Sequence, residues 1–185
     1  MRITTGAFRG RVIDTVRDLS VRPATDRVRQ TLFNMLSARM ALEGAKVLDL
    51  FAGSGILGIE ALSRGAARVT FVEISPRPAE LLESALKNLG CLASADLRMM
   101  DAMDFLAVNR EAYDLVFADP PYAFNLTSTI PRRVFSGGTV VPGGYLLIEH
   151  ENTLSFEDTP EYRAGPRKRF GRTAVTFFQQ RISPP

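Results

Sequence analysis

The stretch Val47-Leu-Asp-Leu-Phe-Ala-Gly-Ser-Gly55 restricts the possible folds more than any other part of this sequence. An apolar run that contains one carboxylate, Asp49, ends in a glycine turn, and helical periodicity begins directly after that turn. A buried parallel strand that ends in glycines and continues into a helix brings backbone N–H groups close to a bound ligand. The stretch therefore predicts the nucleotide-binding end of an α/β fold. Asp49 either caps the following turn or binds a partner, because a charge in a buried strand is costly unless it is satisfied.

Strand and helix patterns alternate along the following part of the chain. The hydrophobic pattern predicts strands at 47–51, 69–73, 96–100, 113–118 and 145–149. Helices are expected at 56–64 and 76–89, and a short one directly after Asp101. Repeated strand–helix units with short connections are typical of a doubly wound parallel sheet. The segment 123–143, which contains Pro131, indicates only a broken helix and loops.

Both ends of the chain add elements to this pattern. Residues 1–22 indicate a short extended arm around a glycine-bounded turn at 6–10, and a helix with apolar residues at helical spacing follows up to Met40. The last part predicts a hairpin with strands at 161–164 and 173–179 around a basic turn at 165–171.

The sequence as a whole predicts an α/β fold. We expect a Rossmann-like, doubly wound, mostly parallel sheet with a C-terminal antiparallel hairpin and a small N-terminal β arm plus a helix. A single domain should span residues 1–185, with the basic arm and its helix in 1–41 and the catalytic core in 46–180.

Composition excludes several classes of protein. The hydrophobic fraction of 45% and the charged fraction of 23% are those of an ordinary soluble globular protein. No apolar run is long enough to span a bilayer, and the N-terminus lacks the hydrophobic segment of a secretory signal. The single Cys91 and the single His150 provide neither an internal disulfide nor a zinc site. We therefore expect a cytoplasmic protein with no bound metal and no membrane contact.

Positive charge is concentrated in two segments. Residues 1–39 contain eight arginines against three aspartates, a balance of +5. Residues 162–172 contain five basic residues and no acid, another +5, which leaves −7 on the remaining chain for the net charge of +3. Two basic segments beside an acidic body indicate a polyanionic partner, although a solvated surface would produce the same pattern.

Three acidic residues end successive strands of the predicted sheet. Glu73 and Asp119 end their strands, and Asp101 comes directly after its strand. Because the carboxyl ends of parallel strands share one edge of the sheet, these acids should line the same crevice as the glycine turn. Glu73 stands about where a carboxylate accepts hydrogen bonds from ribose hydroxyls in nucleotide-binding folds. Each acid alone is often a helix cap, but their matching positions in successive units favour a common ligand.

At these residues the chain resembles a known class of enzymes. Asp49-Leu-Phe-Ala-Gly-Ser-Gly55, followed by Glu73 and Asp101, is similar to the cofactor site of class I S-adenosylmethionine-dependent methyltransferases. Asp119-Pro-Pro-Tyr122 resembles the signature of enzymes that methylate exocyclic amino groups of nucleic-acid bases. The blocks at 1–11, 22–34 and 168–173 resemble the bacterial 16S rRNA guanine-N2 methyltransferase family, so that the resemblance covers essentially the whole chain.

The resemblance implies a role for each of these residues. The catalytic group would be Asp119, Pro120 and Tyr122, whose carboxylate, carbonyl and ring would hold the target amine and stack on its base. The S-adenosylmethionine site would consist of Asp49, Phe51, Gly53, Ser54, Gly55, Glu73, Asp101 and Ala102. The phosphates of 16S rRNA, free or in an assembling small subunit, would bind Arg9, Arg11, Arg22, Arg27, Arg29, Arg167, Lys168, Arg169 and Arg172. The expected protein is a monomer.

Three other interpretations remain open. The same Asp119 chemistry would serve an amino methyltransferase of DNA adenine or of another RNA. A non-catalytic RNA-binding or ribosome-assembly factor could retain the fold without the reaction. Gly53, Gly55 and Gly58 also have the Gly-x-Gly-x-x-Gly spacing of dinucleotide-binding dehydrogenases, against which Asp119-Pro-Pro-Tyr122 and the basic arm argue.

Overall fold

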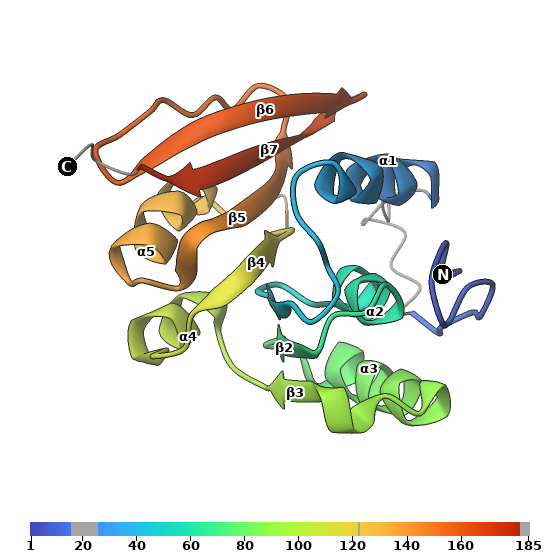
Figure 1. Ribbon diagram of the computed structural model, residues 1–185. Helices are drawn as coiled ribbons and strands as arrows, with labels where there is room; N and C mark the ends of the chain where they lie inside the picture. Colours follow the sequence, from blue (N-terminus) through green and yellow to red (C-terminus); the bar gives the residue numbers. More distant parts are fainter. Residues whose placement is uncertain (16–25, 122, 182–185) are drawn as a thin grey trace.

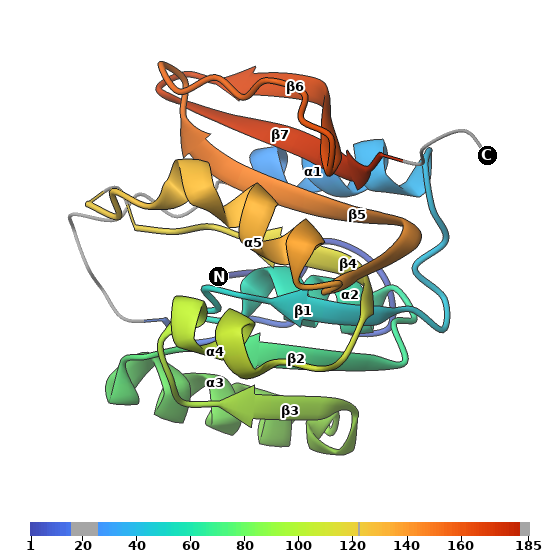
Figure 2. The same cartoon turned by 90° about the vertical axis from the view of Figure 1, so that its left-hand side faces the viewer.

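The computed structural model describes residues 1–15, 26–121 and 123–181. In this part of the chain one seven-stranded sheet has the strand order β3-β2-β1-β4-β5-β7-β6. Figure 2 shows the strands stacked in this order, from β6 at the top to β3 at the bottom. Their bounds are β1 Lys46–Asp49, β2 Arg68–Val72, β3 Ala95–Arg98, β4 Tyr113–Ala118, β5 Val140–Glu151, β6 Tyr162–Phe170 and β7 Thr173–Gln180.

The strand directions confirm the predicted fold. Neighbouring strands from β3 to β5 pair in parallel, whereas β7 pairs antiparallel with both β5 and β6. The strand order reverses at β1 and β4, and in open α/β sheets ligands bind at the carboxyl ends of the strands at such a point.

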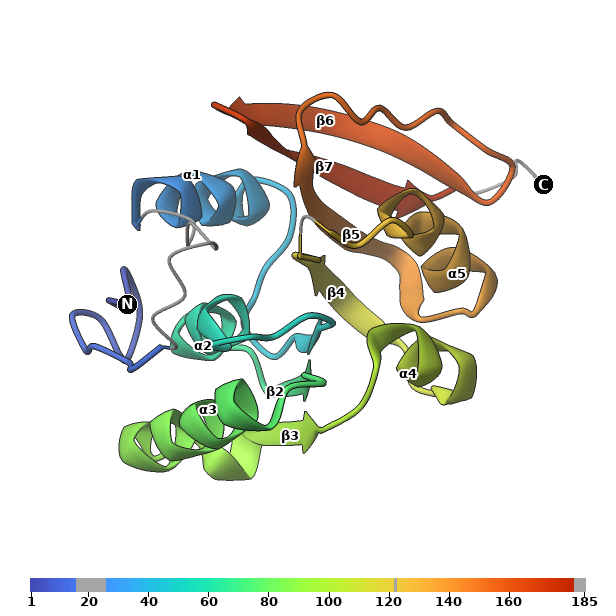
Figure 3. The ribbon, with the colours of Figure 1, turned by 180° about the vertical axis from the view of Figure 1, so that it is seen from behind.

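Helices cover both faces of the sheet. Figure 1 places α1 (Asp26–Ser37), α2 (Ile56–Ser63) and α3 (Pro76–Leu89) on one face, and α4 (Ala102–Val108) and α5 (Ile130–Ser136) on the other. The view from behind in Figure 3 shows the same division. Two short 3₁₀ turns complete the elements, η1 (Leu92–Ser94) and η2 (Thr127–Thr129). Each face of the sheet packs its own cluster of buried aliphatic and aromatic side chains, which is the arrangement expected of a doubly wound fold.

Local sequence signals explain where several helices begin and end. Ser75 precedes α3, Pro76 occupies its first turn, and Gly90 ends it in a left-handed conformation with φ of 74°, as Pro and Gly preferences predict. Pro131 likewise lies in the first turn of α5, where the missing N–H is tolerated. The segment 123–143 is therefore a 3₁₀ turn, a short helix and the start of β5.

The N-terminal arm is a small hairpin that is fixed to α2. Arg2 and Val12 form an antiparallel bridge, which confirms the expected extended arm. The buried carboxylate of Glu60 in α2 accepts hydrogen bonds from the backbone N–H and the hydroxyl of Thr4. Gly6 approaches Ser63 so closely that a Cβ atom at Gly6 would lie 1.7 Å from the Ser63 carbonyl oxygen. These contacts hold the arm against α2.

The predicted basic turn at 165–171 is wrong in its extent. β6 runs from Tyr162 to Phe170 and pairs with β7, so the chain turns only at Gly171 and Arg172. Gly165 and Pro166, which suggested the turn, instead lie at an irregularity in the pairing between Ala164 and Arg167. Such a bulge is tolerated because β6 is an edge strand. The basic residues therefore lie along a strand.

Candidate active site

A cavity of about 810 Å³ opens at the carboxyl edge of the parallel strands. Its walls come from the loops after β1, β2 and β4, from the start of α4, from β5 and from two residues of the N-terminal arm, Met1 and Thr15. All of the predicted cofactor residues except Gly55 line it: Asp49, Phe51, Gly53, Ser54, Glu73, Asp101 and Ala102. Asp119 and Pro120 line the same cavity. The fold thus brings together residues that are far apart in the sequence.

The three glycines between residues 53 and 58 are each favoured by a different feature of the structure. Gly53 has φ of 52° and donates its N–H to Glu73 Oε2 at 2.7 Å in the cavity wall. Gly55 has φ of 71°, and a Cβ there would lie 2.3 Å from Leu82 Cδ1. Gly55 does not line the cavity. A glycine is needed there because the backbone packs closely against Leu82 of α3. A Cβ at Gly58 would lie 2.3 Å from Phe71 Cε1, so the dinucleotide-like spacing reflects close packing of α2 on β2.

Two of the strand-end acids already accept backbone hydrogen bonds. Glu73 accepts from the N–H groups of Gly53 and Ser75, both at 2.7 Å. Asp101 Oδ1 accepts from Met103 and Asp104 at 2.7 and 3.1 Å, so it caps α4. A carboxylate offers about four acceptor positions, which leaves both side chains able to accept from a ligand.

Asp49 is a buried carboxylate at the end of β1. It is 1% exposed, and its Oδ2 accepts a hydrogen bond from the N–H of Gly58 at 3.0 Å. Burial raises the pKa of Asp49 to about 7, the Gly58 N–H opposes this rise, and the nearby carboxylate of Glu73 adds to it. Near neutral pH a cationic ligand would therefore favour its charged form.

Asp119 lies directly after β4 and is open to the solvent in the cavity. The pKa of Asp119 is raised well above its usual value, mainly because the cavity walls limit its hydration and also because Glu149 and Asp49 lie nearby. Pro120 follows it in the cavity wall. Tyr122, the third predicted catalytic residue, lies outside the described residues.

Glu149 in β5 is a cavity residue that the sequence prediction missed. Burial raises its pKa, whereas the side chain of Thr173 favours its charged form. The available signal was the same as for the other acids, because Glu149 ends the predicted strand 145–149.

Acidic side chains are numerous in the lining of the cavity. Among the described residues that line it are six with carboxylate side chains and none with a lysine or arginine side chain: Asp49, Glu73, Asp101, Asp119, Glu149 and Glu151. Such a lining attracts cations and N–H donors and repels phosphates. A dinucleotide with its two phosphates does not fit this lining, which argues against the dehydrogenase interpretation.

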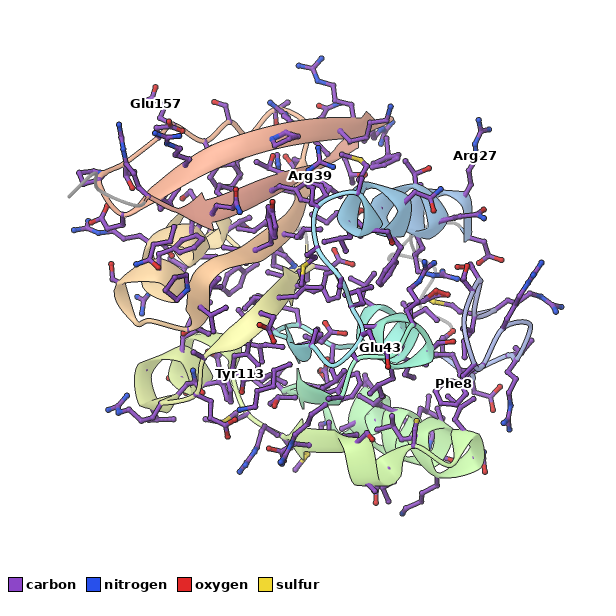
Figure 4. The ribbon with its side chains drawn as sticks, viewed as in Figure 1. Phe8, Arg27, Arg39, Glu43, Tyr113 and Glu157 are labelled. Carbon is purple, nitrogen blue, oxygen red and sulfur yellow. The ribbon has the colours of Figure 1, made fainter. Side chains whose placement is uncertain are left out.

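The predicted RNA-binding residues fall into different environments. Those exposed at the surface are Arg9, Arg11, Arg27, Lys168, Arg169 and Arg172. In Figure 4 the side chain of Arg27 extends outward from α1 into solvent. Arg11 also donates to the carbonyl of Asn88 at 2.6 Å. Arg22 lies outside the described residues.

Two of those residues make internal contacts, and the burial of Arg29 contradicts the prediction for that residue. Arg29 is 1% exposed and donates to Asp26 Oδ1 and to the carbonyl of Arg2, so it joins α1 to the N-terminal arm and cannot reach a phosphate. Arg167 is half-buried and donates to the carbonyl of Asn152, so it supports the segment after β5. Charge alone had suggested RNA contacts, but both guanidinium groups serve internal structure.

The described residues contain neither a cluster of metal ligands nor a helix that could span a membrane. In residues 1–15, 26–121 and 123–181 no group of three or more His, Cys, Asp or Glu side chains could hold a metal ion. In the same ranges no helix has the length and hydropathy needed to cross a bilayer.

Comparison with known proteins gives consistent results. The family model described as "Conserved hypothetical protein 95" matches residues 1–179. Two proteins named "Ribosomal RNA small subunit methyltransferase D" are similar to the chain. That of Escherichia coli K12 is 37% identical over 97% of this chain and 90% of its own length. That of Haemophilus influenzae is 37% identical over 82% and 79%.

A solved structure supports the same relationship. The structure of the protein yhhF of Escherichia coli superposes on this chain with a TM-score of 0.86. The two sequences are 32% identical, and the match covers 99% of each chain. The fold and the family resemblance expected from the sequence are thereby confirmed.

Proposed function

The chain belongs to the family described as conserved hypothetical protein 95, and from this premise we propose that it is an S-adenosylmethionine-dependent methyltransferase that modifies the N2 amino group of a guanine in small-subunit rRNA. The names of the relatives support methyl transfer to small-subunit rRNA. Asp119-Pro-Pro-Tyr122 supports an exocyclic amino group as the target, and the resemblance of 1–11, 22–34 and 168–173 to guanine-N2 enzymes supports guanine N2.

The cavity fits S-adenosylmethionine in size and charge. The volume of about 810 Å³ lies within the range of small-molecule sites. Glu73 would accept hydrogen bonds from ribose hydroxyls. The carboxylate of Asp49 would attract the ammonium group of the cofactor. Asp101 and the Ala102 backbone would contact adenine, with Phe51, Gly53 and Ser54 in the adjoining wall. When bound, S-adenosylmethionine supplies an electrophilic methyl group on a positively charged sulfur, and the negative lining suits that charge.

Asp119 carries the chemistry in this proposal. An exocyclic amine of a base is a weak nucleophile because its lone pair is delocalised into the ring. The Asp119 carboxylate and the Pro120 carbonyl would accept its two N–H groups and so localise the lone pair on nitrogen. After nitrogen gains the methyl group it carries a positive charge and an extra proton. The raised pKa of Asp119 suits it to accept that proton.

The substrate base has to leave its stack to reach this group. Asp119 and Pro120 line a cavity rather than a flat surface, so the guanine would enter as a flipped or loop base. Tyr122, at the end of the motif, would stack on it. The exposed arginines of the arm, α1 and the β6–β7 hairpin would bind phosphates on either side. We propose that one monomeric chain provides this site within a single domain of residues 1–185.

Asp119 lies in a cavity to which the described residues contribute six acidic side chains and no lysine or arginine, and its substitution tests the proposal. Purified protein with labelled S-adenosylmethionine and unmethylated small-subunit rRNA should yield one N2-methylguanine by mass spectrometry. Asp119→Ala should lower kcat by about 10²-fold or more and still bind the cofactor. Glu157→Ala is the matched control, because Glu157 is exposed, does not line the cavity and is labelled in Figure 4.

Three outcomes would reject parts of the proposal. Label in duplex DNA rather than rRNA would favour a DNA amino methyltransferase. Full methylation by Asp119→Ala would remove Asp119 from the reaction, and RNA binding without any methylation by the wild-type protein would favour an assembly factor.

A further inference from the structure

Asp119 and Glu149 are neighbours at the carboxyl edge of the sheet. In the parallel pairing of β4 with β5, Phe117 lies opposite Leu147 and Ala118 opposite Ile148. Glu149 is the next residue of β5, and Asp119 is the first residue after β4. Side chains alternate between the faces of a strand, so both acids lie on the same face as Phe117 and Leu147, which share one core cluster.

Among the described residues, Glu149 has no lysine or arginine side chain beside it in the cavity wall. Glu149, Asp119 and Asp49 all line the cavity, and no lysine or arginine among the described residues lines it with them. The charge of Glu149 contributes to the raised pKa of Asp119. Removing a charged carboxylate from water costs free energy unless hydrogen-bond donors compensate it. Within the described residues, the side chain of Thr173 favours the charged form, which leaves acceptor capacity facing the cavity.

We propose that Glu149 selects guanine by accepting the N1–H of the target base while Asp119 accepts the adjacent N2 amino group. The inference rests on the proposed function and assigns it a specificity-determining residue. Asp119 alone recognises only an amino group, which adenine and cytosine also carry.

The hydrogen-bonding edges of the bases explain the selectivity. Guanine presents a ring N1–H beside its N2 amino group, two adjacent donor positions that match two carboxylates. Adenine and cytosine present a ring nitrogen acceptor beside their amino groups, which a carboxylate at Glu149 repels. Loss of a hydrogen bond to a buried acceptor discriminates strongly, because the acceptor is then left unpaired.

A base analogue separates this role from a general effect on Asp119. 2-Aminopurine has the same N2 amino group as guanine, but its N1 is an acceptor. If Glu149 only tuned Asp119, its substitution would change methylation of both bases in proportion. If Glu149 contacts N1, Glu149→Gln should change their ratio, because the glutamine amide can donate to the N1 of 2-aminopurine.

The experiment measures kcat/KM on rRNA fragments with guanosine or 2-aminopurine riboside at the mapped target position. The wild-type protein should prefer guanosine by about 10- to 100-fold. Glu149→Gln should lower the rate on guanosine and reduce that preference by about 10-fold or more. Glu151→Gln removes another carboxylate from the cavity wall and should keep the wild-type preference. Thermal unfolding and cofactor binding of each variant report whether it is folded.

Several results would overturn the inference. One is an unchanged preference in Glu149→Gln, and another is equal methylation of both bases by the wild-type protein, which needs no variant to fold. In either case N2-methylguanine formed by the wild type would leave the proposed function intact. No methylation of guanosine by the wild type would instead reject the proposed function, and this inference with it.

Discussion

The N–H of Gly58 donates to the buried carboxylate of Asp49 at 3.0 Å, which links the first helix turn of α2 to the end of β1. This single hydrogen bond satisfies part of an acid that burial would otherwise make very costly. Gly58 also lets α2 approach β2, since any Cβ there would meet Phe71. One glycine thus serves both the packing of the helix and the electrostatics of the site.

Asp49→Asn should make the protein more stable at pH 8 than the wild type, and this gain should shrink steadily as the pH falls toward 4. The pKa of Asp49 is about 7 in the fold, above its unfolded value, so the folded state holds the proton more tightly. The stability that this proton provides is complete below the unfolded pKa and is lost as pH rises through 7. Asparagine does not ionise, so the variant does not lose this stability. At pH 8 its free energy of unfolding in urea should exceed that of the wild type by about 2–4 kcal/mol. A gain of the same size at pH 5 would contradict this.

Asp49→Asn should also weaken the binding of S-adenosylmethionine by about 10-fold or more, because the ammonium group of the cofactor loses its carboxylate partner. Titration calorimetry in buffers of different ionisation enthalpy should show proton release by the wild type near pH 6.5 and a smaller release by Asp49→Asn. Asp104→Asn, an exposed acid outside the cavity, should release protons as the wild type does.

Gly58→Ala should destabilise the protein by about 1–3 kcal/mol because of overpacking. The added methyl would lie 2.3 Å from Phe71 Cε1 and 2.8 Å from Val69 Cγ1, so helix and strand have to separate. Combining Gly58→Ala with Phe71→Leu should cost less than the sum of the two single changes. Additive free energies of unfolding would show that the two side chains do not meet.

Glu60→Ala should release the N-terminal arm. Glu60 is fully buried, accepts hydrogen bonds from Thr4, and pairs with Arg64 at 3.7 Å. Its removal leaves these groups without their acceptor and should cost about 3 kcal/mol in urea unfolding. Proteolysis within residues 1–15 should also become faster. Glu80→Ala, whose pair with Arg77 is exposed at 3.4 Å, should change neither result.

Arg169→Gln should weaken rRNA binding and reduce the salt dependence of the affinity. Arg169 is exposed on β6, and each lost phosphate contact lowers the slope of log K against log salt by about 1. Filter binding at several salt concentrations measures this slope. Arg110→Gln, exposed but outside both basic segments, is the control. Equal slopes for the two variants would exclude a phosphate contact at Arg169.

Short-range signals made much of this fold predictable. The apolar run at Val47, the Ser75-Pro76 start and the Gly90 stop each depend on backbone rules that act within a few residues. Asp119 was predicted as a strand-end acid, and the cavity does bring it together with Asp49 and Glu73. The alternation of strands and helices was sufficient to place these acids at one edge.

Other features depend on which elements lie side by side, and sequence patterns do not contain that information. Arg29 has the charge of an RNA contact, but α1 packs it against the arm. Gly165 and Pro166 have the composition of a turn, but pairing with β7 extends the strand through them.

The sequence by itself determined the order of strands and helices, the cofactor turn and the motif at Asp119, because periodicity, caps and glycine conformations are local. Only the tertiary structure decided that Glu149 stands beside Asp119, that Gly55 supports α3 rather than the cavity, and that Arg29 is internal. Strand register and burial set these outcomes, and both arise from contacts between residues that are distant in the chain.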